Sequence, residues 1–284
     1  MGVHVPVLSV IVPVRNGFPW LSEQLEALGN QRCDDRWEVV IADNGSTDGS
    51  RELAESWAAH RGNARVVDAS AVPGAPAARN VGVRASRGEL LAFCDADDRV
   101  DPDWVRGCID ALNGAELVAG VFDFSSLNGL GETAAVPAAT RQLGFLPAGL
   151  TANLAVRRDA FEAVSGFDEA LLLGDDIDFC WRVQLRGYRF AIARNALVAK
   201  RERSTAREVF RQSTAYGRCG PVLYRRHRVN GAHRDLRGAT KAWVWLVVAS
   251  PRLFQPSQRA RWVRTAGVRL GRLSGSVRQR TFYP

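Results

Sequence analysis

The chain has 284 residues, of which 46% are hydrophobic and 24% are charged, so it is long enough for one large α/β domain with an appendage or for two small domains. Its net charge of +8 is unevenly distributed, because residues 201–284 hold 19 Lys and Arg against 3 Asp and Glu, whereas residues 1–200 hold 19 against 27. The five cysteines are scattered and never spaced as Cys-x-x-Cys, which argues against a structural zinc site or a disulfide framework and favours a reducing cytoplasm.

The first hundred residues alternate between short apolar runs and amphipathic stretches. No signal peptide is expected before them, since residues 1–6 have neither a basic region nor a long apolar run. The run at 7–14 is rich in β-branched residues and ends in Arg15-Asn16-Gly17, which predicts a buried strand followed by a loop. The same reasoning predicts strands at 7–14, 37–42, 65–68 and 90–94 and helices at 20–28, 51–60 and 77–85.

The order of these elements is typical of a parallel sheet with crossover helices. In such a sheet, ligands bind beyond the carboxyl ends of the strands. Polar clusters follow three of the predicted strands, at Arg15-Asn16, Asp43-Asn44 and residues 95–98. The sequence therefore predicts an α/β fold, Rossmann-like and mostly parallel with flanking helices, in which three strand ends converge on one crevice.

The remainder of the chain is less regular. Residues 113–146 are rich in Gly and Ala and predict no element, whereas residues 159–164 and 175–186 predict helices. After residue 200 the chain becomes Arg-rich and helical in pattern. The apolar stretch 243–249 has only seven residues, which is too short to span a bilayer.

Three carboxylates follow the strand predicted at 90–94, at Asp95, Asp97 and Asp98. Carboxylates at the end of a buried strand repel one another unless a cation or bound hydroxyl groups offset their charge. Their hard oxygen atoms suit Mg²⁺ or Mn²⁺, which usually keep waters and bind substrate phosphates. The alternative is an acidic turn that caps a following helix, and the spacing alone does not decide between the two.

Five motifs in order resemble those of family 2 glycosyltransferases, which have the GT-A fold. The resemblance runs over about residues 8–186, and five ordered motifs are far more specific than any one of them. It implies a GT-A catalytic domain over residues 1–200. The motifs are SVIVPVRN at 9–16 (opening strand and nucleotide loop), VIADNGSTDG at 40–49 (second strand and turn), AARNVG at 77–82 (short helix beside the donor), CDADD at 94–98 (metal motif) and GDDIDFCWR at 174–182 (segment of the catalytic base).

The resemblance implies a nucleotide pocket at the first two strand ends. Pro13 and Arg15 would line the base and ribose pocket. Asp43 would accept a hydrogen bond from the nucleobase, although it is also placed to cap the next helix. Arg79 would reach the base or the pyrophosphate, for which a guanidinium fork is well suited, and the alternative is an ordinary surface arginine.

For the acidic motif, the resemblance implies that Asp95 contacts the ribose and that Asp97 binds the metal, Mn²⁺ or Mg²⁺. A divalent ion there would offset the charge that builds on the departing nucleoside diphosphate. Asp98 is either a supporting carboxylate or a helix N-cap. Asn153 is a candidate contact to the donor sugar, and a role in a turn is an equal alternative.

Asp176 is the candidate catalytic base. Members of the family usually read Gly-Glu-Asp here, and this chain has Asp175 in place of the Glu. Asp176 would take the proton from the acceptor hydroxyl as its oxygen attacks the anomeric carbon, and a single displacement of this kind inverts the anomeric configuration. The alternative is that both residues only cap the following helix.

One feature departs from the family pattern. Many relatives place a His after the base helix, near the metal or the phosphates. Here that stretch reads AKRER at 199–203, and none of the four histidines is close to it. Lys200 and Arg203 are the candidates for a phosphate contact in its place.

Residues 201–284 form a basic, aromatic-rich region for which we expect helices. Basic and aromatic residues on amphipathic helices suit an anionic membrane surface, and the alternative is that the helices pack on the first domain. A nucleic-acid partner is disfavoured because no binding motif occurs in its usual context. We therefore expect a cytoplasmic protein that is peripheral at the inner face of the membrane.

The resemblance implies an inverting glycosyltransferase that uses a UDP-, dTDP- or GDP-sugar and a hydroxyl of a glycan or lipid-linked acceptor. A sugar nucleotidyltransferase is one alternative, but residues 14–17 are too poor in glycine for its phosphate loop. A non-catalytic module tethered to a membrane or a polyanion is another. A Rossmann dehydrogenase is disfavoured because no GxGxxG follows the first strand.

Overall fold

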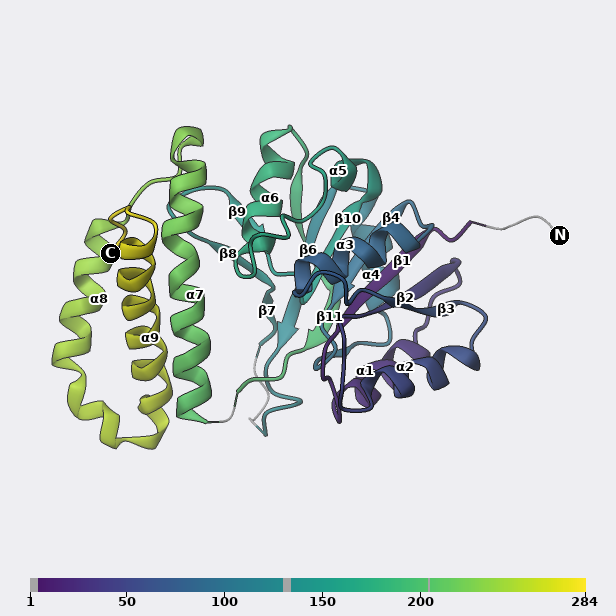
Figure 1. The fold of residues 1–284 in the computed structure, drawn as a ribbon, viewed down its shortest axis with the longest axis horizontal. Coiled ribbons are helices and arrows are strands. Elements are labelled where there is room, and N and C mark those ends of the chain that lie inside the picture. The colour runs from purple at the N-terminus through teal and green to yellow at the C-terminus, as the bar shows by residue number, and fades with distance from the viewer. Residues whose placement is uncertain (1–4, 130–133, 204) are drawn as a thin grey trace. The chain divides into compact units, whose positions relative to one another are not determined.

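The computed structural model describes residues 5–129, 134–203 and 205–284 (Figure 1). The chain forms two compact units. The first comprises Met1–Thr140 and Pro147–Glu202, and the second comprises Arg141–Leu146 and Arg203–Pro284. The short segment Arg141–Leu146 therefore belongs to the second unit, although residues 147–202 of the first unit separate it in the sequence from the rest of the second unit.

A mixed β-sheet forms the centre of the first unit. Its strands lie in the order β3-β2-β1-β4-β10-β6-β11-β5, and β7 pairs with β6 outside this path. The strands are β1 Leu8–Val14, β2 Trp37–Asp43, β3 Ala64–Asp68, β4 Leu90–Cys94, β5 Arg99–Val100, β6 Leu117–Asp123, β7 Val136–Pro137, β10 Asn153–Arg157 and β11 Phe190–Ala199. A separate ribbon pairs β8, Ala139–Arg141, with β9, Pro147–Gly149.

The parallel half of the sheet consists of β3, β2, β1 and β4. Strands β1, β2 and β4 are almost entirely buried, as expected for apolar runs in a parallel sheet that is covered on both faces. Val14 lies opposite Asp43, and Asp43 lies opposite Asp68, so three strands end at the same edge. The predicted fold class is confirmed.

The other half of the sheet differs from the expectation in two ways. Strand β10 is antiparallel to both β4 and β6, so Asn153 at its start lies opposite Cys94 at the end of β4. Strand β6 lies within residues 113–146, for which the sequence predicted no element, and it is a buried central strand. Strand β11 runs parallel to β6 and antiparallel to β5.

The helices of the first unit connect these strands. Helix α1 buries Leu21, Leu25 and Leu28, the face that the sequence spacing predicts. Helix α4 was not predicted, and its fully buried Trp104 packs in the core of the unit. The helices are α1 Leu21–Gly29, α2 Ser50–Ala59, α3 Ala75–Ala85, α4 Trp104–Leu112, α5 Arg158–Glu162 and α6 Asp175–Leu185.

The second unit is helical, as expected, with α9 lying between α7 and α8 (Figure 1). Close packing of α7 on α9 depends on glycine, because a Cβ added to Gly217 would lie 2.9 Å from the Cα of Gly271. Within the part of the chain that the structure describes, no helix is both long enough and apolar enough to cross a bilayer. The elements are α7 Ala206–His227, η1 Arg228–Asn230, α8 Leu236–Val248, η2 Ser250–Phe254 and α9 Pro256–Arg278.

Candidate active site

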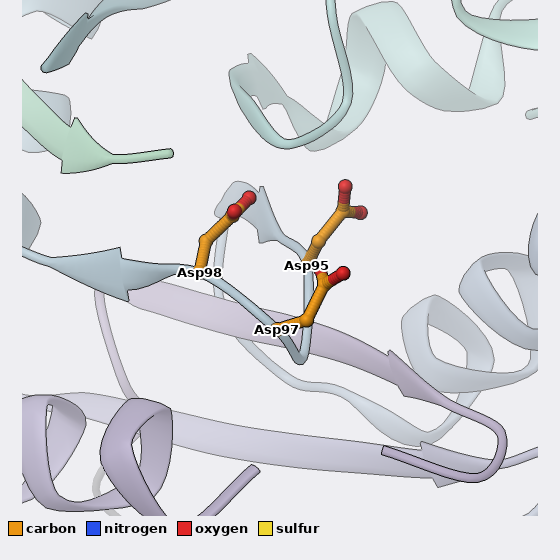
Figure 2. Close-up of side chains that lie close together, drawn as sticks. All are labelled: Asp95, Asp97 and Asp98. Atoms are coloured by element: carbon orange, nitrogen blue, oxygen red, sulfur yellow. The ribbon is translucent and has the colours of Figure 1, made fainter. Parts of the chain in front are cut away.

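Three carboxylates gather in the turn between β4 and β5. Asp95, Asp97 and Asp98 follow the last residue of β4, and their carboxylate oxygens lie within 4.8 Å of one another. Figure 2 shows the three side chains leaving the same turn and pointing to the same side of it. Asp98 is fully buried, whereas Asp95 and Asp97 are partly exposed. Strand β5 follows directly, so the alternative that Asp98 caps a helix is wrong.

The end of β11 brings two cationic residues to this cluster. The ammonium of Lys200 donates to Asp98 Oδ2 at 2.7 Å and to Asp95 Oδ2 at 3.2 Å. The backbone N–H of Arg201 donates to Asp98 Oδ1 at 3.0 Å, and its guanidinium donates to the main-chain oxygen of Asp97 at 3.0 Å. These contacts offset the mutual repulsion of the carboxylates.

Lys200 stays charged in this setting. Burial acts to lower the pKa of its ammonium, but the carboxylates of Asp95 and Asp98 outweigh that effect and raise the pKa well above its ordinary value. Burial acts to raise the pKa of Asp95, yet the charges of Lys200 and Arg79 hold the pKa of that carboxyl below its ordinary value. The pair Lys200–Asp95 is therefore ionic at neutral pH.

Arg79 in α3 connects the acidic cluster with α6. Its guanidinium donates to Asp95 Oδ1 at 3.3 Å and to Asp175 Oδ2 at 3.0 Å. The side chain is only 7% exposed, so the alternative of an ordinary surface arginine is wrong. Its Nε is buried without a hydrogen-bond partner among the described residues. The predicted contact of Arg79 with the base or the pyrophosphate stays a prediction.

Asp176 lies in the first turn of α6. The helix begins after Gly174, whose φ of 77° is a left-handed conformation that glycine adopts at little cost. Asp176 Oδ1 accepts a hydrogen bond from the backbone N–H of Ile177 at 2.8 Å. Burial and the neighbouring charge of Asp175 raise the pKa of Asp176 to about 7. A carboxylate with a pKa near neutrality is well matched to accept a proton at physiological pH.

The residues predicted for the nucleotide pocket lie at the ends of β1 and β2. Pro13 is partly buried within β1, and Arg15 is exposed directly after it. Asp43 is buried; it accepts a hydrogen bond from the backbone N–H of Ser46 at 3.3 Å and lies 4.0 Å from the guanidinium of Arg51. The carboxylate therefore stabilises the turn after β2, and its predicted contact with a nucleobase stays a prediction.

Asn153 faces the interior of the sheet. It is 1% exposed, and its amide donates to the main-chain oxygens of Val121 and Ala196, each at 2.9 Å. Its side-chain oxygen accepts a hydrogen bond from Trp104 Nε1 at 2.8 Å. Because the amide is engaged on both sides within the protein, the expectation that Asn153 contacts the donor sugar is wrong. The residue instead ties β10 to β6, β11 and α4.

The oxygen donors of the cluster fit a divalent cation. Asp97 and Asp95 are partly exposed carboxylates, the hard ligands that Mn²⁺ and Mg²⁺ take in proteins. Asp98 is held inward by Lys200 and by the backbone of Arg201, so it fits a supporting position. Asp97, with Asp95 beside it, is thus the residue that would hold the ion.

Comparison with known proteins agrees with this geometry. A family model described as glycosyl transferase family 2 matches residues 9–147, and one described as glycosyl transferase family group 2 matches residues 90–265. The chain belongs to glycosyl transferase family 2. The two matches together span residues 9–265, which include the acidic cluster, Arg79, Lys200 and α6.

Two curated relatives of this family 2 chain are informative. Glycosyltransferase AglE of Haloferax volcanii is 30% identical over 200 residues, which are 68% of this chain and 66% of AglE. Pre-mycofactocin glycosyltransferase of Mycobacterium tuberculosis is 25% identical over 260 residues, which are 86% of this chain and 53% of that protein. The chain therefore spans about half to two thirds of the length of these relatives.

Solved structures share the GT-A fold of this family 2 chain. The mannosyltransferase PcManGT from Pyrobaculum calidifontis, in complex with GDP-Man and Mn²⁺, has a TM-score of 0.66 at 18% identity, covering 96% of this chain and 88% of that one. GalNAc-T7 with UDP, GalNAc and Mn²⁺ has a TM-score of 0.60 at 16% identity, covering 70% and 44%. At these identities the likeness establishes the fold.

The two residues predicted to contact a phosphate in place of the family's usual His have different surroundings in the structure. Lys200 lies within the acidic cluster, whereas Arg203 is an exposed residue at the start of the second unit. The predicted phosphate contact of Arg203 stays a prediction. The sequence reasoning gave Arg201 no role, and the only signal for it was its place directly after Lys200.

Proposed function

We propose that this chain is a metal-dependent, inverting glycosyltransferase that transfers a sugar from a nucleotide-sugar donor to an acceptor hydroxyl. One observation carries the proposal. A continuous set of charged contacts runs from Lys200 through Asp95 to Arg79 and ends at Asp175, the neighbour of Asp176. It joins a metal-type acidic cluster to a carboxylate suited to accept a proton, the two groups that displacement at an anomeric carbon requires.

In the proposed reaction Asp97 would hold the divalent ion, and Asp95 beside it would contact the ribose. When bound, that ion offsets the negative charge of the departing nucleoside diphosphate. Asp176 accepts the proton of the acceptor hydroxyl as its oxygen bonds to the anomeric carbon. The bond from that carbon to the diphosphate oxygen breaks on the opposite face, and the configuration is inverted. The Arg79–Asp175 contact keeps the start of α6 in a fixed position relative to Asp95.

The proposed donor is a UDP-, dTDP- or GDP-sugar. Two structural neighbours were solved with GDP-Man or UDP together with Mn²⁺, which supports this donor class and a Mn²⁺ or Mg²⁺ cofactor without choosing the base. Pro13, Arg15 and Asp43 would line the base and ribose pocket, and Arg203 would contact a phosphate. The proposed acceptor is a hydroxyl of a glycan or a lipid-linked saccharide, and the proposed location is the cytoplasmic face of a membrane.

Release of nucleoside diphosphate from a panel of nucleotide sugars tests the proposal. We expect release that requires Mn²⁺ or Mg²⁺ and that falls at least about 100-fold in Asp97→Ala and in Asp176→Asn. Asp34→Ala is the matched control, because the Asp34 side chain is fully exposed and lies outside the site. Release of pyrophosphate from a nucleoside triphosphate and a sugar phosphate would instead indicate a nucleotidyltransferase. Donor binding without any turnover would indicate a binding module.

A further inference from the structure

The last turns of α8 present an apolar face to solvent. Val244, Val247 and Val248 are 56%, 73% and 75% exposed. Their spacing of three and four residues places them on one side of the helix. The opposite side packs on α9, where Leu246 is buried and its main-chain oxygen accepts a hydrogen bond from Trp262 Nε1 at 3.0 Å. These valines therefore do not take part in the packing of α8 on α9.

The surroundings of this apolar face are strongly basic. From Leu236 to Pro284 the sequence has ten Lys and Arg and no Asp or Glu. Lys241 is exposed one turn before Val244, and Arg259 and Arg261 are exposed at the start of α9. The guanidinium of Arg261 lies 5.2 Å from the centre of the Trp245 ring, which brings its charge to the same end of α8.

The apolar and basic side chains also border a shallow depression. Its volume is about 370 Å³, and the residues that line it are Thr240, Lys241, Val244, Trp245 and Val248. The solvent-exposed surface inside this depression is almost entirely apolar. Helix α8 continues through the turn η2 into α9, so the apolar face lies at the end of a helical hairpin (Figure 1).

We propose that this end of the hairpin, the α8 tip, docks on the surface of an anionic lipid bilayer. The α8 tip is defined by Val244, Val247 and Val248 together with Lys241 and Arg261. The indoles of Trp243 and Trp245 in α8 are half-buried. Such indoles beside exposed valines and basic groups form the combination that enters the boundary between headgroups and acyl chains. The valines lose contact with water there while the cations meet lipid phosphates. Nucleic acid would satisfy the charges but would leave the valines in water.

Co-sedimentation with lipid vesicles, without donor or acceptor, tests the α8 tip. The probe is a vesicle of phosphatidylcholine with phosphatidylglycerol, and vesicles of phosphatidylcholine alone are the second arm. We expect binding to the anionic vesicles at physiological salt and at least about tenfold weaker binding to the neutral ones. The double variant Val247→Asp with Val248→Asp should bind the anionic vesicles at least about tenfold more weakly, since each buried valine contributes more than that effect requires.

Val277→Asp is the matched control, because Val277 is 79% exposed in the last turn of α9 and is therefore remote from the α8 tip along the hairpin. It should bind like the unchanged protein, and all variants should keep the unchanged melting temperature. The proposal is overturned if the unchanged protein does not bind anionic vesicles, or if the double variant binds them as well as Val277→Asp does. Tighter binding to duplex DNA than to the vesicles would overturn it as well. The assay contains no nucleotide sugar, so its failure would leave the proposed transfer activity untouched.

Discussion

Replacing Lys200 by methionine should destabilise the first unit by about 3 kcal/mol. Removing one partner of a buried ion pair generally costs about 3–5 kcal/mol, because the other charge stays buried. The lower end applies here for two reasons. Lys200 is 24% exposed, and Asp98 keeps the hydrogen bond from the backbone of Arg201. Burial also raises the pKa of Asp98 to about 7, so the carboxyl can take up a proton once the ammonium is gone.

The same replacement should strengthen the binding of Mn²⁺. In the unchanged protein the ammonium of Lys200 occupies oxygens of Asp95 and Asp98, and a divalent ion must compete with it for the charge of the cluster. Loss of the ammonium removes that competition. A ligand that binds the native state raises the melting temperature in proportion to the logarithm of its concentration over Kd, so Mn²⁺ should raise the melting temperature of Lys200→Met more than that of the unchanged protein.

Thermal unfolding with and without Mn²⁺ measures both effects. For a unit of this size a loss of 3 kcal/mol corresponds to a decrease of roughly 6–12 °C. Lys241→Met is the control, since Lys241 is the other lysine of the chain and is exposed on α8; it should change the stability by less than about 0.5 kcal/mol. A Lys200→Met protein as stable as this control, or one that Mn²⁺ stabilises less than the unchanged protein, would refute the reasoning.

Three further perturbations follow from the structure. The rate of transfer should rise with pH through about 7 and then level off, because Asp176 must lose its proton to act as a base, and Asp176→Asn should abolish this dependence in a pH–rate profile. Asn153→Ala should lower the unfolding free energy by about 3 kcal/mol in urea titrations, since buried partners of its amide lose their hydrogen bonds, while donor affinity measured on the folded protein stays within twofold. Gly271→Ala should lower the melting temperature of the second unit, because a Cβ there overlaps the main chain of α7. The cost of this overlap outweighs the roughly 1 kcal/mol by which Ala favours a helix over Gly. Gly62→Ala is the control, since a Cβ at Gly62 meets nothing within 4 Å.

The parallel half of the sheet was predictable because its signals are local. The runs that form β1 and β4 are continuously apolar and end in polar turns, so their bounds match the predicted ones to within one residue. Strand β6 carries no such signal, because Ala119 and Gly120 interrupt its β-branched residues. The structure gives the reason for Gly120: a Cβ there would overlap the amide of Asn153 and the main chain of β11. That constraint comes from strands remote in the sequence, so the local pattern cannot express it.

The site divides in the same way. Asp97 and Asp176 were found because each belongs to a short motif with fixed neighbours. The partners of Arg79 could not be found, because its contacts to Asp95 and Asp175 span 16 and 96 residues. Lys200 was a candidate only because the family's usual His is absent from this stretch of the sequence. Its contacts with the acidic cluster could not be predicted, because they depend on how β11 pairs with β5.

The identity of Lys200 is itself informative. The chain has 38 Lys and Arg, of which only Lys200 and Lys241 are lysines, so arginine is the usual cation of this sequence. An ammonium is a compact point charge with three donors, whereas a guanidinium is a planar fork that best matches a single carboxylate. Lys200 bonds two carboxylates of the same turn from one nitrogen atom. The neighbouring arginine, Arg201, instead spreads its guanidinium between the main chain of the turn and Glu23. The two positions therefore differ in the geometry that the acidic cluster imposes, and the lysine occurs where one small positive charge serves two carboxylates.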